Sequence, residues 1–196
     1  MGHAEEFRRY ARVVVRVKAE ILAFAGPICS GKSVISTSVA QRLGWDWVSF
    51  ADFLRDEARR RGIDPSLRSL LQDLGQAFID KGWTSFCKSV LDYGKWVPGM
   101  NLVIDGIRHV EAVHTLRMLT APSHLAVVFV ETPIQIRKAR FLAREPGASF
   151  DAVDTHPVEM ETQTALMQVA GYKVDGSLAV EEASNRLLEQ FSPSAD

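Results

Sequence analysis

Cysteine is scarce in this sequence. Only Cys29 and Cys87 occur in 196 residues, which is too few for a disulfide framework or a structural zinc site. Isolated thiols are typical of proteins from a reducing compartment. Hydrophobic residues make up 46% of the chain, and a domain of this length can bury enough of them to fold without a metal or a disulfide.

Long apolar runs and an excess of charge of one sign are also missing. No run approaches the roughly 18 residues that span a bilayer, and the opening stretch MGHAEEFRRYAR is too charged for a signal peptide. We therefore expect a cytoplasmic protein that does not associate with membranes. The chain carries 23 basic and 24 acidic residues, a balance that gives no strong signal for nucleic-acid binding.

Short apolar segments alternate with helical patterns along the chain. The segments with the composition of buried strands are 21–25, 45–50, 101–105, 125–131 and 172–175. This alternation predicts one α/β domain over residues 1–196, in which helices cover both faces of a parallel sheet. Only residues 51–98 are purely helical between two strands, which predicts an inserted helical subdomain. The stretch 145–157 has the composition of a loop.

The stretch FAGPICSGKS, residues 24–33, follows the first apolar segment and precedes an amphipathic helix. It matches the pattern G-x-x-x-x-G-K-[ST] (Walker A), in which backbone N–H groups surround phosphate oxygens. Glycine permits the backbone angles and the close approach that such a loop needs, and the start of the helix adds partial positive charge. The residues expected to bind a nucleoside triphosphate, ATP, are Gly26, Ser30, Gly31, Lys32, Ser33 and Val34.

Lys32, Ser33 and Asp105 have side chains suited to different parts of a magnesium nucleotide. The Lys32 ammonium can reach the β- and γ-phosphates, where we expect it to act in catalysis, and the Ser33 hydroxyl can ligate Mg²⁺. Asp105 stands at the end of a buried strand in VIDGIRH, at the sheet edge where ligands bind in open α/β folds. There it is expected to act in catalysis by holding the water shell of Mg²⁺; the alternative is that it caps the following helix.

Arginines near the same edge are expected to bind the substrate. Arg108 follows Asp105, and a guanidinium bonds phosphate oxygens in pairs. Asp52 and Arg55 come just after the second strand. Arg55 can bind the phosphate of an acceptor, whereas Asp52 can cap its helix or accept a proton from a hydroxyl group.

Three further arginines, Arg137, Arg140 and Arg144, fall on one face of the helix predicted over 133–144. The pattern offers them no acidic partners, so they are expected to repel one another unless a polyanion lies close. Phosphoryl transfer needs positive charge around the moving group. We therefore expect Arg140 and Arg144 to act in catalysis and Arg137 in substrate binding, within a lid over 137–158; an ordinary exposed helix is the alternative.

These motifs, in this order, resemble the P-loop nucleoside monophosphate kinase family, with its adenylate kinase-like and dephospho-CoA kinase-like members. The resemblance rests on GPICSGKS, SFADFLRDEARRRG, LQDLGQAF, VIDGIRHVEAVHTLR and VFVETPIQIRKARFLARE. It implies a three-layer α/β/α P-loop NTPase fold with sheet order 2-3-1-4-5 and an acceptor-binding insertion over 51–98. It also implies that Arg55 and Arg108 bind the acceptor, that Asp105 lies near Mg²⁺, and that Arg140 and Arg144 belong to the lid.

The combined expectation is a phosphotransferase, dependent on ATP and Mg²⁺, whose acceptor is a small nucleotide. Arg55 and Arg108 favour a (deoxy)nucleoside monophosphate, because transfer to a phosphate requires no general base. A hydroxyl acceptor such as dephospho-CoA stays open, with Asp52 as the base. The third possibility is a P-loop protein that binds ATP or GTP as a switch and presents the helical insertion to a protein partner.

Overall fold

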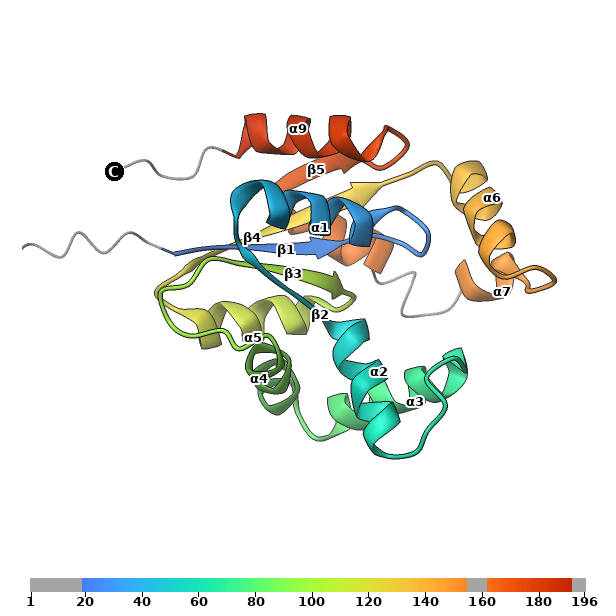
Figure 1. Ribbon diagram of the computed structural model, residues 1–196, viewed down its shortest axis with the longest axis horizontal. Helices are drawn as coiled ribbons and strands as arrows, with labels where there is room; N and C mark the ends of the chain where they lie inside the picture. Colours follow the sequence, from blue (N-terminus) through green and yellow to red (C-terminus); the bar gives the residue numbers. More distant parts are fainter. Residues whose placement is uncertain (1–18, 155–161, 192–196) are drawn as a thin grey trace, which may run out of the picture.

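A computed structural model describes residues 19–154 and 162–191. At its centre lies a five-stranded sheet in which every pair of neighbouring strands is parallel (Figure 1). The strand order is β2-β3-β1-β4-β5, which confirms the predicted order. The strand bounds are β1 Glu20–Ala25, β2 Asp46–Ser49, β3 Leu102–Ile107, β4 His124–Glu131 and β5 Tyr172–Asp175.

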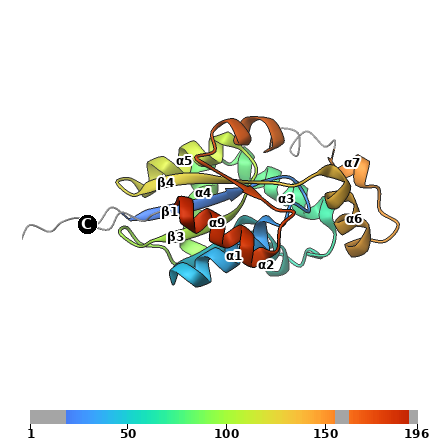
Figure 2. The same ribbon diagram turned by 90° about the horizontal axis from the view of Figure 1, so that it is seen from above.

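Helices cover both faces of the sheet, as the alternation of segments predicts. α1 and α9 lie on one face, and α4 and α5 lie on the other (Figures 1 and 2). The helix bounds are α1 Lys32–Leu43, α2 Phe50–Arg60, α3 Arg68–Asp80, α4 Trp83–Tyr93, α5 Val110–Thr120, α6 Ile134–Arg144, α7 Phe150–Asp154 and α9 Val180–Gln190, with a π-helical turn at Thr162–Leu166. This arrangement is the three-layer α/β/α fold.

β1 lies in the middle of the sheet and is apolar from Ile21 to Ala25. Successive residues of a strand point to opposite faces: Ile21 and Ala23 belong to the core beneath α4 and α5, whereas Leu22 and Phe24 belong to the core beneath α1 and α9. All four are 0% exposed. A central parallel strand is apolar on both faces because helices cover both, which explains the unbroken apolar run before the glycine loop.

The three helices between β2 and β3 do not all belong to one layer. α4 packs against α5 and the sheet through Phe86, Val90 and Leu91. α2 begins directly at the carboxyl end of β2 and, together with α3, lies outside the sheet layers at that edge (Figure 1). Phe53 of α2 and Phe78 of α3 pack edge to face with centroids 5.2 Å apart, and Phe78 stacks on Phe86 at 5.2 Å. Aromatic contacts therefore attach α2 and α3 to α4, which covers one face of the sheet.

Residues 150–154 form the helix α7, although the composition of 145–157 predicts a loop. The prediction is wrong here because tertiary contacts hold the helix: Phe150 is buried against Phe141 of α6 and Ile28 of the glycine loop. The first 18 residues and the segment 155–161, which includes the end of the predicted lid, lie outside the described residues. Within the described ranges, no helix is long and apolar enough to cross a membrane.

Candidate functional site

The loop between β1 and α1 is built around Gly26 and Gly31. Gly26 has a φ of 148° and Gly31 a φ of 94°. Residues other than glycine rarely adopt a backbone conformation with such a positive φ. A Cβ atom on Gly26 would lie 2.6 Å from the carbonyl oxygen of Val130, so a larger residue would push the loop away from β4. Lys32 is the first residue of the twelve-residue helix α1. The loop therefore runs into a helix N-terminus, whose unpaired N–H groups favour an anion.

The Lys32 side chain is turned back over this loop. Its ammonium donates a hydrogen bond to the carbonyl oxygen of Pro27 at 3.3 Å, and the residue is only 9% exposed. The pKa of Lys32 is lowered to about 8, first by burial and then by the nearby charge of Arg108, against the opposing charge of Asp105. A buried cation over a loop of this geometry is suited to an anionic ligand, because a bound phosphate would offset the cost of burying the charge.

Ser33 and Asp105 are in contact at the end of the glycine loop, although 72 positions separate them in the sequence. The Ser33 hydroxyl donates to Oδ2 of Asp105 at 2.7 Å. β3 is displaced by one residue against β1 directly after Asp105, at Gly106, whose φ is 88°. The N-cap position of the helix that follows is His109, which makes no side-chain capping hydrogen bond, and not Asp105. Asp105 therefore has no capping role, and its carboxylate lies at the loop as expected.

The Ser33–Asp105 pair has the chemistry of a magnesium site. Asp105 is 3% exposed, and burial raises the pKa of its carboxyl group, against the opposing charge of Lys32. Its Oδ1 atom is buried without a hydrogen-bond partner among the described residues. Burying such an atom costs folding free energy unless a metal or an ordered water interacts with it. Carboxylate and hydroxyl oxygens are the ligands that Mg²⁺ prefers, so the residues present fit the ion.

Two arginines, Arg108 and Arg144, lie within electrostatic reach of Lys32, and a third, Arg68, lies within reach of both arginines. The pKa of Arg108 is lowered to about 10, first by burial and then by the charge of Arg68, against the opposing charge of Asp105. Burial also lowers the pKa of Arg68, and the charge of Arg144 lowers it further, whereas Glu145 raises it. Arg144 likewise lowers the pKa of Lys32. We call Lys32, Arg68, Arg108 and Arg144 the cation cluster; each lies within electrostatic reach of another member.

Arg68 is the member of this cluster that sequence reasoning missed. It is the first residue of α3, and it carries no motif that distinguishes it from the other arginines of the 51–98 region. Its proximity to Arg108 and Arg144 arises because α2 and α3 fold back over the carboxyl edge of the sheet, which no local pattern reveals.

Arg140 supports the glycine loop from outside. Its Nη1 atom donates to the carbonyl oxygens of Cys29 and Ser30, both at 3.3 Å, and its Nη2 atom donates to the carbonyl oxygen of Gly176 at 2.9 Å. Thr132 donates to the same oxygen of Ser30 at 2.8 Å. The Arg140 guanidinium thus fixes the loop backbone, whereas Arg144 at the end of α6 is exposed, with Glu145 at 3.1 Å.

Arg137 does not belong to this site. The expectation that it has no acidic partner is wrong, because its two terminal nitrogens donate to the two carboxylate oxygens of Asp154 in α7. The residue is only 4% exposed, and its guanidinium also lies over the ring of Phe150, 5.5 Å from the centroid. We therefore assign Arg137 to the packing of α7 on α6 and not to substrate binding.

The Asp154→Ala variant is expected to destabilise the protein. It removes the carboxylate and leaves the Arg137 guanidinium buried, which costs about 3 kcal/mol in the free energy of unfolding. Thermal and urea unfolding measure this change. The matched control is Asp151→Ala on the same helix, because Asp151 is exposed and lies 3.4 Å from the exposed Lys138; its effect is expected below about 0.5 kcal/mol. Equal stability of the two variants would contradict the structural role of Arg137.

The remaining predicted residues lie at the edge of the site. Ser49 caps α2 by accepting from the backbone N–H of Asp52 at 3.4 Å, so the Asp52 carboxylate is not the cap. The Asp52 carboxylate instead accepts a hydrogen bond from Arg55 at 2.7 Å. The side chain of Asp52 is 43% exposed and that of Arg55 is 45% exposed. The charge of Asp52 raises the pKa of Asp105, which places it near the Ser33–Asp105 pair. The side chain of Val34 is exposed.

Solved structures with the same fold include two kinases. A shikimate kinase from Aquifex aeolicus vf5 superimposes with a TM-score of 0.54 and 18% identity, over 87% of this chain and 94% of that one. A sugar kinase from Janibacter sp. HTCC2649 gives a TM-score of 0.51 and 16% identity, over 90% of this chain and 96% of that one. The chain therefore has the P-loop nucleoside monophosphate kinase-like fold that its motifs predict.

No protein-family model matches the chain, but curated relatives do. UPF0200 proteins of Thermococcus onnurineus and Aeropyrum pernix are each 31% identical over 131 residues, which is 63% of this chain and 68% and 64% of theirs. One from Pyrobaculum aerophilum is 32% identical over 121 residues, 62% of each chain. The chain thus spans slightly less than two thirds of the Aeropyrum and Pyrobaculum proteins. At 31% identity over 68% of the Thermococcus protein, the chain belongs to the UPF0200 family.

Proposed function

We propose that this protein is a phosphotransferase that moves the γ-phosphoryl group of a nucleoside triphosphate, such as ATP, to a nucleoside or deoxynucleoside monophosphate. The observation that carries the proposal is the cation cluster beside the glycine loop. Lys32 and Arg108 lie within electrostatic reach of Asp105, which is paired with Ser33, and Arg68 and Arg144 lie within reach of these two cations. A donor triphosphate and an acceptor monophosphate that meet there would neutralise charges that otherwise repel one another.

The donor triphosphate would lie on the glycine loop. Backbone N–H groups of the loop and of the α1 N-terminus would bind its oxygens, and the Lys32 ammonium would reach the terminal phosphates. Ser33 and Asp105 would hold Mg²⁺, which supplies charge neutralisation at the transferring group. Arg140 would keep the loop in shape through the carbonyl oxygens of Cys29 and Ser30. Arg140 and Arg144 both come from the segment 137–158, which we propose as the lid.

The acceptor would lie between the sheet edge and the helices α2 and α3. Arg108 follows β3 and Arg68 begins α3, so the acceptor phosphate would be held from two sides. We propose the region 51–98 as the acceptor-binding part of the domain on this ground. Arg55 is directed to Asp52 in this structure, so it would contact an acceptor only after leaving that ion pair. Because a phosphate acceptor is already anionic, positioning and charge neutralisation suffice for transfer.

The experiment that tests this proposal measures nucleoside diphosphate formation from ATP and Mg²⁺ by the purified full chain. The acceptors are the common NMPs and dNMPs, dephospho-CoA, or none. We expect at least one monophosphate to raise the rate by about tenfold or more over the acceptor-free reaction, since ordering both reactants is the main source of rate acceleration in such sites. A rate that no acceptor changes would contradict the kinase and favour a nucleotide-dependent switch.

A hydroxyl acceptor is the second candidate, and the position of Asp52 near Asp105 favours it. A carboxylate there could take the proton of the attacking hydroxyl. The Asp52→Asn variant separates the two candidates. Transfer to a hydroxyl would fall by about 100-fold or more when the base is lost, whereas transfer to a monophosphate would change little.

A further inference from the structure

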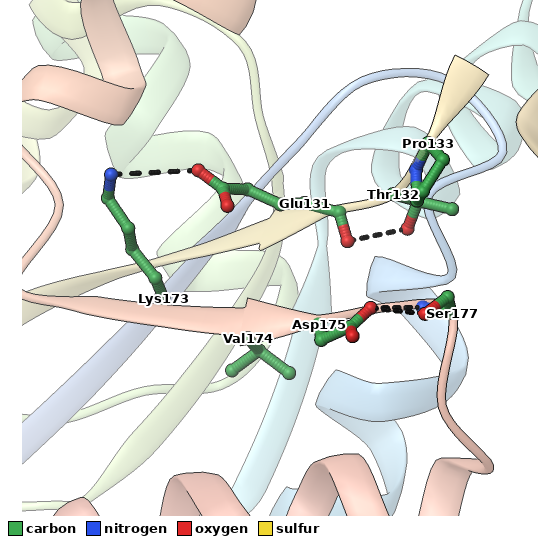
Figure 3. A pocket seen from close by; sticks show the side chains of 7 residues that line it. All are labelled: Glu131, Thr132, Pro133, Lys173, Val174, Asp175 and Ser177. Atoms are coloured by element: carbon green, nitrogen blue, oxygen red, sulfur yellow. Dashed lines mark hydrogen bonds and ion pairs between the residues drawn. The ribbon is translucent and has the colours of Figure 1, made fainter.

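A cavity of ≈ 510 Å³ lies at the carboxyl ends of β4 and β5 (Figure 3). Thr132 and Pro133 line it from the end of β4, and Asp175 and Ser177 line it from the end of β5. Lys173 and Glu131 form an ion pair of 3.6 Å at its other end. The size is that of a small-molecule site, which combines apolar walls with a few fixed polar groups.

The cavity adjoins the glycine loop. Gly176, between the lining residues Asp175 and Ser177, is packed so closely on the loop that a Cβ atom would lie 2.2 Å from the carbonyl oxygen of Ser30. Thr132 donates to the same oxygen at 2.8 Å. In the sheet order, the cavity lies on the β4–β5 side of β1, whereas Arg108, which follows β3, and the helices α2 and α3 lie on the β3–β2 side. A triphosphate on the loop can therefore place its nucleoside here, away from the acceptor.

The Asp175 carboxylate is fixed at the rim of this cavity. Its Oδ1 atom accepts from the backbone N–H of Ser177 at 2.8 Å and from the Ser177 hydroxyl at 2.5 Å. These bonds lower the pKa of Asp175, so the group is ionised at neutral pH. Neither bond uses Oδ2, and the side chain is directed along the cavity rim beside Ser177 in Figure 3. An ionised carboxylate can only accept hydrogen bonds.

The two purine bases present different partners to such a group. Guanine carries two adjacent donors, N1–H and the N2 amino group, which match an acceptor-only carboxylate. Adenine carries one donor, the N6 amino group, next to the N1 lone pair, which a carboxylate repels. Building on the proposed function, we propose that Asp175 makes this cavity a guanine-selective base site, so that the protein binds GTP in preference to ATP.

Competition binding on the full chain tests the base preference without turnover. A fluorescent guanine nucleotide is displaced by unlabelled GTP, ATP and xanthosine triphosphate in the presence of Mg²⁺. We expect GTP to bind about tenfold or more tightly than ATP, because hydrogen bonds to a charged group discriminate by at least that factor. Equal affinity, or a preference for ATP, would overturn the inference and leave the proposed phosphoryl transfer intact.

The Asp175→Asn variant tests the residue itself. Asparagine keeps an oxygen for Ser177 and adds a donor, which matches the C2 carbonyl of xanthine. The variant should lose its preference for GTP, gain affinity for xanthosine triphosphate by about tenfold, and bind ATP as the wild type does. The control is Glu131→Gln at the other end of the cavity, which should leave base preference unchanged. Equal losses for GTP and ATP in Asp175→Asn would overturn the inference, since they indicate a contact to ribose or a structural role.

Binding and turnover also separate this inference from the proposed function. If no triphosphate binds to the wild type, both the base site and the loop assignment fail. If GTP is preferred but no acceptor stimulates turnover, the base site stands and the kinase proposal fails. Far-UV circular dichroism and the thermal midpoint of each variant show whether it is folded before its affinities are compared.

Discussion

The Lys32→Ala variant is expected to lose phosphoryl transfer and tight triphosphate binding together. The Lys32 ammonium lies over the glycine loop, 3.3 Å from the carbonyl oxygen of Pro27, where it can move to a phosphate oxygen at short range. Removing a preorganised charge of this kind costs about 10²- to 10³-fold in kcat/KM. Steady-state kinetics measure the loss of transfer, and titration with a fluorescent nucleotide measures the loss of affinity.

Unfolding of the variant would not account for this result. Burial lowers the pKa of Lys32 to about 8, below its ordinary value, so the folded state disfavours the charged ammonium at neutral pH and its removal relieves that cost. We expect the thermal midpoint of Lys32→Ala at pH 7 to equal or exceed that of the wild type. The matched control is Lys138→Ala on the exposed face of α6. Triphosphate affinity that is the same in Lys32→Ala and in this control would contradict the assignment.

The Arg108→Ala variant is expected to lose acceptor-dependent turnover while it keeps its affinity for the donor. Arg108 lies within electrostatic reach of Asp105 and Arg68, whose charges shift its pKa in opposite directions, and we assign its guanidinium to the acceptor phosphate. Loss of a charge-assisted pair of hydrogen bonds to a phosphate should reduce kcat/KM for the acceptor by about 100-fold. The dissociation constant of the donor, measured without acceptor, should change by less than about threefold.

Arg68→Ala should behave like Arg108→Ala, because both residues are assigned to the same phosphate. The double variant should therefore lose less than the product of the two single losses, as expected for groups that act on one ligand. Arg59→Ala on α2 is the matched control, since Arg59 is exposed and paired with Asp56. A loss of donor affinity as large as the loss of acceptor turnover would contradict the assignment of Arg68 and Arg108 to the acceptor.

The sequence alone predicts the sheet and the loop because both depend on local patterns. Runs such as ILAFA are long enough to form buried strands, and glycine, lysine and serine at fixed spacing mark the turn into α1. The end of a parallel strand also lies near its neighbours' ends, which is why Asp105 can be predicted close to Ser33. The structure brings the two side chains to 2.7 Å.

The tertiary structure alone decides which charges meet. Arg137, Arg140 and Arg144 share one face of a helix, but α7 provides Asp154 for the first, the loop carbonyls bind the second, and the third lies within reach of Lys32 and Arg68. Periodicity assigns a residue to a face and not to a partner, because the partner depends on how distant segments pack.

Arg68 and Asp175 illustrate the same limit. Arg68 has no local signal, and it joins the cation cluster only because α3 folds over the sheet edge. Asp175 ends a short strand, and it becomes part of a cavity only because β5 pairs with β4 beside the loop. The amino-acid sequence thus determined the strands, the helices and the phosphate loop through short-range preferences of the backbone. The packing of segments more than a hundred residues apart in the chain, as in the contact of Arg140 with Cys29, decided which side chains surround that loop.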